Sequence, residues 1–499
     1  MTYRACFTML KKTILLLILC NFSALAFAAP FIDANNRWLR SDIQTLADHH
    51  IIKVPITQWP IMWASIGDDL DNQVLDEIPE ELLRPFKRVI KAYTLATKTA
   101  VQNSIDISLA NQNAIFTEFA DTQREKVQQK ITTDIVGDKI AVRLSGSRVI
   151  NAYDGQDYRL DGSYLGYIWG NWALSIGSVD RWWGPAWKSA HILSSNARPI
   201  PSLSIQRNRS TPFESSWLRW IGPWTFETFL GQLENDRAIA NAKIWGARFT
   251  FKPLESLEIG FNRTAIWAGR GRPKDLKTFY NLFIGNDNIG QDLSRADEPS
   301  NQQAGMDLRW HMSSAGVPAS FYMQYIGEDK LIKLIPSKAT TAYGFETEAF
   351  FHHWGSIRAY VEYSNTATSG FLSIRTNNTS YEHSLYRSGY RYHGRVLGAS
   401  WDNDSVVWSA GIIASNYANQ ELAISYSNMD LNRDNTARAA PGGNSVTKTH
   451  LKVNTVDIRH RYYFKKSYID TTVNIKDKNI NAFDVSGKYR IGLSYHLEF

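Results

Sequence analysis

The chain is poor in cysteine: it has two, Cys6 and Cys20, and none after residue 20. Neither a disulfide nor a thiolate metal site can therefore hold the rest of the fold together. After the N-terminal region, no uninterrupted apolar stretch approaches the roughly 18 residues of a membrane-spanning helix, which excludes such helices. The net charge is also modest. A value of +7 over 499 residues, widely dispersed, does not support nucleic-acid binding, so we predict no nucleic-acid partner.

The first 28 residues have the pattern of an export signal. Arg4, Lys11 and Lys12 supply a positive start, an apolar run follows over 13–19, and small residues at 26 and 28 form a cleavage pattern. An uncleaved membrane anchor would need a longer apolar core. We therefore predict that residues 1–28 are removed. The three cations leave with them and no acid does, so the net charge falls from +7 to +4.

The last twelve residues, 488–499, alternate with a period of two. Large apolar side chains at Ile491, Leu493, Tyr495, Leu497 and Phe499 are separated by small or polar ones. This pattern predicts a strand with a different solvent on each face. A strand of a soluble sandwich would alternate in the same way. However, a final strand that stops on Phe499 is similar to the sorting signal of outer-membrane barrels, and predicts the barrel-assembly machinery as a partner.

The chain changes character near residue 126. Before it, Leu39, Ile43 and Leu46 recur at helical spacing, and a longer amphipathic segment runs over 79–93. We predict about three helices over 29–126. None has the apolar length to enter lipid, so this small bundle is expected in the periplasm.

From 127 to 499 the period becomes two. Around 341–363, residues such as Phe345 and Val361 fall on one face, while Glu346, Arg358 and Glu362 fall on the other. Apolar groups outside and charges inside are what a lipid-embedded barrel with a wet interior requires. The 17 Trp, 23 Tyr and 23 Phe suit aromatic girdles at the membrane interfaces. The predicted fold is an all-β transmembrane barrel of about 18 antiparallel strands, integral to the outer membrane.

Turns and loops give the barrel two different ends. Long connections are predicted at 180–215, 270–304, 364–394 and 427–449, facing outside, while tight turns face the periplasm. The tight turns are expected at 169–171, 222–223, 252–256, 313–319, 353–356, 402–405 and 464–467. Function should concentrate in the long loops or in the lumen beneath them.

The first long loop is basic and rich in tryptophan. Between 181 and 209 it holds five Lys or Arg, three Trp and no acid. Sugar rings stack on aromatic side chains, and Arg pairs with the carboxylates of acidic sugars, so the loop suits an acidic polysaccharide. The same residues could equally plug or line the lumen, and composition leaves both interpretations open. The candidate binding residues here are Arg181, Trp182, Trp183, Trp187, Lys188, Arg198 and Arg207.

A second cluster, 386–395, has three Tyr and three Arg in ten residues. Its alternation also fits a strand that turns its arginines toward water, so the same two interpretations apply. Its candidate binding residues are Tyr386, Arg387, Tyr390, Arg391, Tyr392 and Arg395.

Catalytic and metal motifs are weaker. Ser388, with His383 or His393 and Asp402 or Asp404, contains the residue types of a hydrolase triad, but a triad is defined by geometry. The segment 285–292 resembles a calcium loop without the spacing of an EF-hand. The pair at 49–50 is expected to be solvated rather than a zinc site. We predict no enzymatic activity, no cofactor and no metal.

Three segments resemble the Wzi-type capsule-assembly family of outer-membrane proteins. They are WWGPAWKSAHILSSNARPIPSLSIQR (182–207), SWLRWIGPWTFETFLGQLE (216–234) and YEHSLYRSGYRYHGRVLGASWDNDS (381–405). The segment 38–63 is similar to the helical region of that family. The resemblance implies an eighteen-stranded barrel with a periplasmic helical bundle, and a lectin that attaches capsular polysaccharide to the cell surface.

The predicted function is therefore a non-enzymatic, monomeric outer-membrane lectin for capsular polysaccharide or an exopolysaccharide, anchored in outer-membrane lipid. A passive porin is the first alternative, and it would conduct ions through an open lumen. An envelope hydrolase is the second, and it would depend on Ser388 and His393.

Overall fold

The computed structural model describes residues 30–98, 101–284, 300–314, 317–332, 335–351, 355–368, 377–416, 419–436 and 443–499. The predicted signal peptide and the segment 285–292 lie outside these residues. Among the residues described, no helix has the length and apolarity that crossing a membrane requires.

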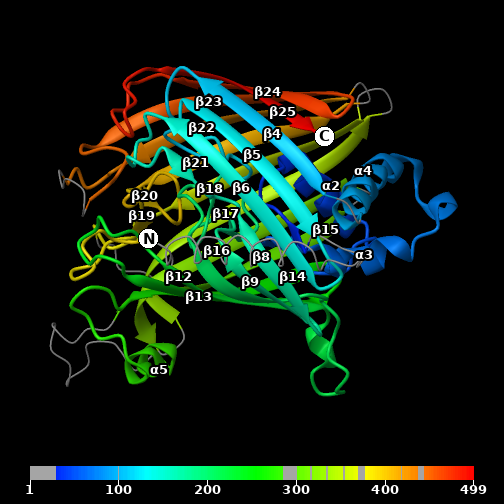
Figure 1. The fold of residues 1–499 in the computed structure, drawn as a ribbon, viewed down its shortest axis with the longest axis horizontal. Coiled ribbons are helices and arrows are strands. Elements are labelled where there is room, and N and C mark those ends of the chain that lie inside the picture. Colours follow the sequence, from blue (N-terminus) through cyan, green and yellow to red (C-terminus); the bar gives the residue numbers. More distant parts are fainter. Residues whose placement is uncertain are drawn as a thin grey trace, which may run out of the picture.

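Antiparallel strands close into a barrel (Figure 1). The two-residue β7 and the longer β8 pair with different stretches of β6, so together they occupy one strand position in the barrel. Counted by position, the barrel has 18 strands, as predicted. It closes where β25 pairs with β4, from Gly492 opposite Ala110 to Glu498 opposite Ser104. The strands are β4 (Gln102–Ala110), β5 (Val127–Val136), β6 (Ile140–Ile150), β7 (Tyr158–Arg159), β8 (Tyr164–Trp169), β9 (Trp172–Gly177), β11 (Ser202–Arg207), β12 (Trp224–Gln232), β13 (Lys243–Leu254), β14 (Leu257–Trp267), β15 (Ser300–Ser314), β16 (Val317–Ile332), β17 (Ile335–Phe351), β18 (Gly355–Asn365), β21 (Val406–Ser415), β22 (Gln420–Leu431), β23 (Leu451–Phe464), β24 (Ser467–Lys476) and β25 (Tyr489–Glu498).

Side chains along each strand divide between lipid and lumen. On β17 and β18, Phe345 and Val361 are 47% and 50% exposed on the outer wall, whereas Glu346 and Arg358 are fully buried inside. Because successive side chains point to opposite faces, the period-two pattern alone fixes which residues meet lipid. The predicted hairpin faces at 341–363 are confirmed.

The two ends of the barrel differ as predicted, but the predicted long loop 180–215 is wrong in its bounds, because β11 runs through it and residues 208–215 lie at the other end. At one end, called the turn end below, β13 and β14 are joined by two residues, 255–256, and β23 and β24 by 465–466. The opposite end, called the loop end, carries the long connections (Figure 1). They are 111–126, 178–201, 233–242, 268–299, 366–405, 432–450 and 477–488.

Two predicted tight turns are wrong. Residues 402–405 end the long connection between β18 and β21, which pair directly. Gly222 and Pro223 end a longer connection, 208–223, between β11 and β12 at the turn end. In each case the local turn is only the end of a longer connection.

The N-terminal region contains the predicted helices, namely α2 (Arg37–Asp48), α3 (Trp63–Asp71), η1 (Leu75–Glu77) and α4 (Glu80–Thr97). The side chain of Asn36 caps α2, accepting from the amides of Trp38 and Leu39 at 3.1 Å. Two-residue strands flank it: β1 (Phe31–Ile32) pairs with β3 (Ile61–Met62). The helices lie at the turn end, on the right in Figure 1.

The predicted domain boundary at residue 126 does not match this arrangement. β4 is already a barrel strand, with Ile107 and Leu109 exposed on its outer face, and residues 111–126 return into the lumen. α2 also lies within the barrel rather than in a separate bundle, because nearly all its side chains are buried against wall residues. The alternation at 104–109 is short and closely follows the helical pattern that precedes residue 98, so the sequence alone does not separate β4 from the helical region.

Candidate functional site

The lumen is filled by chain. The plug, defined as residues 30–63 and 178–201, is joined by β2 (Gln58–Trp59) pairing with β10 (Trp182–Trp183). Above it lies the cap, residues 377–405, which contains the hairpin β19 (Arg391–Tyr392) and β20 (Arg395–Val396). Ser194 bonds the two together, since its backbone N–H donates to the carbonyl of Leu397 at 2.8 Å.

The three predicted tryptophans lie inside the plug. Trp182 and Trp183 are fully buried and Trp187 is 2% exposed. The indole of Trp183 donates to Glu227 at 3.2 Å and that of Trp187 to Glu346 at 2.7 Å, so both are bonded to the barrel wall. Buried rings with paired N–H groups pack a core and offer no face to a sugar.

The cations of this loop are paired with wall or loop carboxylates. Arg181 binds Glu227 at 2.6 Å, and Arg198 binds Asp161 and Asp154 at 2.8 and 2.7 Å. Lys188 lies 2.6 Å from Glu118 and 3.1 Å from Asp457. Burial opposes charge on both Lys188 and Glu118. The neighbouring opposite charges outweigh it, raising the pKa of Lys188 and lowering that of Glu118. Of the two interpretations of this loop, these contacts favour the plug.

Arg207, the remaining candidate in this segment, is on β11 at the turn end. Its guanidinium lies 3.6 Å from the ring centroid of Trp224 and donates to the carbonyls of Thr211 and Trp224 at 2.8 Å. Arg207 therefore stabilises the connection 208–223 and does not belong to a ligand site at the loop end.

A buried ion-pair network ties α2 to the wall. Asp48 pairs with Arg309 at 2.6 Å, and Arg309 also pairs with Glu346 at 2.7 Å. Burial alone would raise the pKa of Asp48, but Arg309 and then Arg358 outweigh it and lower the pKa to about 2. The sequence placed Glu346 and Arg358 on the inner face correctly. It gave no sign that their partners come from α2.

The same pattern holds in the cap. Arg391 pairs with Asp402 and Glu382 at 2.7 Å each, and Arg395 donates to the carbonyl of Ala114 at 2.5 Å. Tyr386, Tyr390 and Tyr392 are 1%, 0% and 6% exposed. Burial also lowers the pKa of the nearby plug residue His191 to about 3, so its imidazole is neutral. These side chains hold the cap together.

One predicted residue, Arg387, is exposed on the cap. Within the described part of the chain, no carboxylate lies within ion-pair distance of it. Tyr153, in the connection that follows β6, is 37% exposed and lies against the tip of the β19–β20 hairpin. Its hydroxyl is 3.3 Å from the point that a Cβ on Gly394 would occupy. His393, beside Gly394, is partly exposed. We call Tyr153, Arg387 and His393 the cap surface. Tyr153 has no recognisable sequence signal, because it is a single aromatic residue in a short polar loop.

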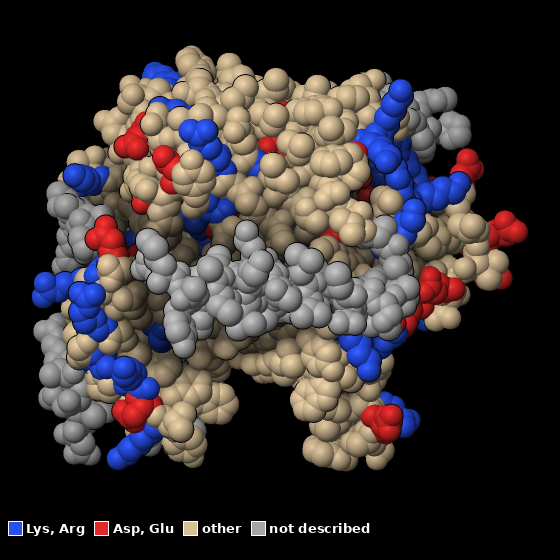
Figure 2. Space-filling model, viewed as in Figure 1, with Lys and Arg blue, Asp and Glu red and all other residues tan. Residues whose placement is uncertain are grey.

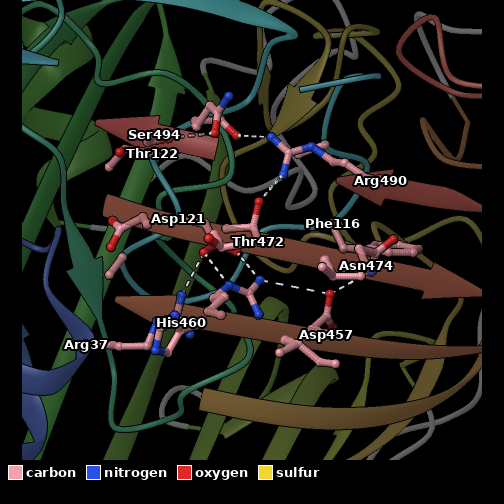
Figure 3. Close-up of a pocket in the computed structure, with 18 of the residues that line it drawn as sticks. Arg37, Phe116, Asp121, Thr122, Asp457, His460, Thr472, Asn474, Arg490 and Ser494 are labelled. Atoms are coloured by element: carbon pink, nitrogen blue, oxygen red, sulfur yellow. Dashed lines mark hydrogen bonds and ion pairs between the residues drawn. The ribbon is translucent and has the colours of Figure 1, made fainter. Parts of the chain in front are cut away.

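A cavity of about 100 Å³ remains between the plug and β23–β25 (Figure 3). Its lining is polar and paired: Arg459 lies 2.6 Å from Asp121, and Arg490 donates to the carbonyl of Gln112 at 3.1 Å and the hydroxyl of Thr472 at 3.3 Å. This volume exceeds the ~10–15 Å³ that a single water requires, so the cavity has room for several waters. The described lumen is therefore a wet, ion-paired interior.

The residues proposed for a hydrolase are engaged in other contacts. Ser388 Oγ accepts from the amide of Ala238 at 2.9 Å, and both oxygens of Asp402 bind Arg391. His383 Nδ1 accepts from the amides of Leu385 and Tyr386. These contacts do not form a Ser–His–acid relay. His49 is half-buried and His50 lies 3.5 Å from Glu255; the described residues contain no group of ligands suited to a metal.

Comparison with known proteins now gives the family. The family model described as capsule assembly protein Wzi matches residues 96–486. The chain belongs to the Wzi capsule-assembly family. An uncharacterised 55.8 kDa protein in the cps region of Klebsiella pneumoniae is 31% identical over 362 residues, covering 70% of this chain and 68% of the relative. Membership of this family gives the chain a general role in capsule assembly.

The fold comparison agrees. The solved structure of Wzi from Escherichia coli matches with a TM-score of 0.81 and 24% identity, covering 94% of this chain and 100% of that one. That protein is described as an outer-membrane protein involved in group 1 capsule assembly and a carbohydrate-binding β-barrel. With its closed strands and apolar outer wall, the present member of the Wzi family is an integral outer-membrane barrel.

Proposed function

We propose that this chain is a lectin that binds capsular or related acidic surface polysaccharide and attaches it to the outer face of the cell, without catalysing a reaction. Membership of the capsule-assembly family supports the proposal, as does the carbohydrate binding described for the Escherichia coli relative. The loop end, which carries the cap, faces outside in this proposal, and α3 and α4 lie in the periplasm. Assembly through the barrel-assembly machinery and a monomeric state stay predictions.

The cap surface is the observation that carries the proposal. A sugar ring can stack on the exposed ring of Tyr153, and a sugar carboxylate can pair with the guanidinium of Arg387. Because the cap is fixed by the buried pairs of Arg391 and Arg395, these groups are presented on an ordered surface. The other twelve predicted residues then act as the scaffold rather than as contacts.

Binding of purified acidic capsular polysaccharide to the detergent-solubilised protein tests the proposal. We expect Tyr153→Ala/Arg387→Ala to weaken binding by about tenfold, since losing stacking and one charge pair removes roughly 1.4 kcal/mol. The remaining binding should also depend less on salt, because an exposed charge pair is screened.

Arg219→Ala is the matched control. Arg219 is exposed in the connection 208–223 at the turn end, so its loss should leave binding unchanged. Equal binding by the double variant and the unaltered protein would refute the cap surface as the contact. No binding by the unaltered protein to capsular polysaccharide or exopolysaccharide would refute the lectin itself.

A further inference from the structure

Helix α5 (Leu276–Ile284) lies on the outside of the barrel. Phe279 packs 5.1 Å from the ring of Trp267 and 6.1 Å from that of Trp245, and Leu282 of the same helix is fully buried in this cluster. Arg263 of β14 donates to the carbonyls of Leu282 and Phe283 at 2.6 and 2.8 Å. These contacts seat α5 against the outer face of β13 and β14 at the loop end.

Part of the surface of α5 that does not pack on the wall is also apolar. Leu276 and Tyr280, about one helical turn apart, are 87% and 61% exposed. Beside them Phe283, 55% exposed, still meets the ring of Trp245 at 5.6 Å. An exposed apolar surface on a helix that already packs on the wall needs a second apolar environment.

The connection 208–223 forms a second projection, which we call the arm. Trp217 and Trp220 on it are 74% and 63% exposed. The arm is fixed to the wall: Trp220 meets the ring of Phe251 edge-on at 6.3 Å, and the amide of Lys252 donates to the carbonyl of Pro223 at 2.9 Å. Its two large rings are therefore held outside the barrel by ordered contacts.

Both projections rest on the same strand. Trp245, under α5, and Phe251, under the arm, are six residues apart on β13. At about 3.4 Å per residue this is roughly 20 Å along the strand, which for a strand tilted by about 40° is about 15 Å along the membrane normal. The two contact points therefore lie within the ~25 Å apolar band, and the projections extend from them toward its two edges. Figure 1 and Figure 2 show the two projections on one side of the molecule, at opposite ends, with barrel wall between them.

We propose that α5 and the arm anchor the barrel at the two interfaces of the bilayer, and that lipid covers the exposed aromatic surface of each. The faces are continuous with the lipid-facing wall, where Phe249, Phe251 and Phe261 stack at 5.4 and 6.2 Å. Trp and Tyr suit the boundary between acyl chains and headgroups, because each has an apolar ring and a polar group. Contacts at both interfaces fix the depth and tilt of this side of the barrel.

Quenching of tryptophan fluorescence tests whether the arm and α5 contact lipid. The full chain is reconstituted in vesicles of phosphatidylcholine whose acyl chains carry bromine near the carbonyl group. Five tryptophans are exposed among the described residues: Trp217 and Trp220 of the arm, and Trp169, Trp310 and Trp408. Trp217→Phe/Trp220→Phe should therefore lower the bromine-quenchable emission by about two fifths.

A reporter on α5 and a matched control complete the experiment. In the Trp217→Phe/Trp220→Phe background, Tyr280→Trp should restore quenchable emission. Leu75→Trp, at an exposed position of η1 between α3 and α4, should add emission that bromine leaves unquenched. Heat-modifiable migration in detergent gels confirms that each variant is folded. Unchanged quenching after loss of the arm tryptophans, or equal quenching of the two reporters, would overturn the proposal.

Discussion

Asp48 shows how single charged residues are accommodated inside this barrel. Its side chain is 5% exposed and lies 2.6 Å from Arg309 and 3.7 Å from Arg358. A charge in such a place is tolerated because an opposite charge from another element meets it. The residue type gives no indication of this partner, which comes from a strand about 260 residues away.

We expect Asp48→Asn to destabilise the folded barrel by about 3 kcal/mol or more, since it leaves Arg309 and Arg358 buried with one counter-charge fewer. Denaturant unfolding of the purified protein, followed by heat-modifiable migration, measures the change. Asp68→Asn is the matched control. Asp68 pairs with Arg209 where both side chains are about half exposed, so its loss should cost under about 1 kcal/mol. Similar losses from both variants would contradict a buried network.

The tryptophan-rich loop shows the limit of inference from residue type. Trp182, Trp183 and Trp187 suited both a sugar-binding loop and a lumen plug, because stacking and core packing use the same rings. Their burial favours packing of the plug. A fall in polysaccharide retention after replacing all three would therefore report on packing of the plug rather than on sugar contact.

At the scale of the element, the arm depends on one backbone conformation. Gly222 has φ of +67°, and a Cβ there would lie 1.9 Å from the carbonyl oxygen of Lys252. Glycine permits both the positive φ and this close approach. The sequence showed a turn at this position, but the sixteen-residue projection that it ends was recognisable only once β11 and β12 were paired.

Gly222→Ala should displace the arm and reduce bromine-quenchable emission about as much as loss of Trp217 and Trp220. Gly170→Ala controls for the φ strain alone, because Gly170 has φ of +57° but nothing within 4 Å of its Cβ position. Full quenching in the Gly222→Ala variant would mean that the arm does not depend on this close approach.

At the scale of the whole molecule, the filled lumen separates this barrel from an open porin. The plug, the cap and α2 occupy the interior, and the cavity beside β23–β25 measures about 100 Å³. Ions would have to pass through a packed, ion-paired interior. The described residues therefore form a plugged cylinder that the cap covers at the loop end.

In planar bilayers we expect the unaltered protein to give little or no steady conductance. Replacing Trp182, Trp183 and Trp187 together by Ala removes the packed rings of the plug, and should raise conductance severalfold if the variant is still inserted. Large, porin-like steps from the unaltered protein would show that the plug moves aside and would favour the channel alternative.

The sequence by itself determined the barrel, a count of about 18 strands and the lipid or lumen side of residues in clearly alternating strands such as those of 341–363, because alternation with a period of two follows directly from strand geometry. It missed β4 and placed β11 in a loop, because short strands give little alternation. Sequence patterns also marked α2 and α4, whose apolar residues recur at helical spacing. Tertiary structure alone decided that α2 and the 178–201 loop enter the lumen, and that Tyr153 and Arg387 stay exposed above it. Burial and charge pairing arise between segments hundreds of residues apart, and no local pattern carries that information.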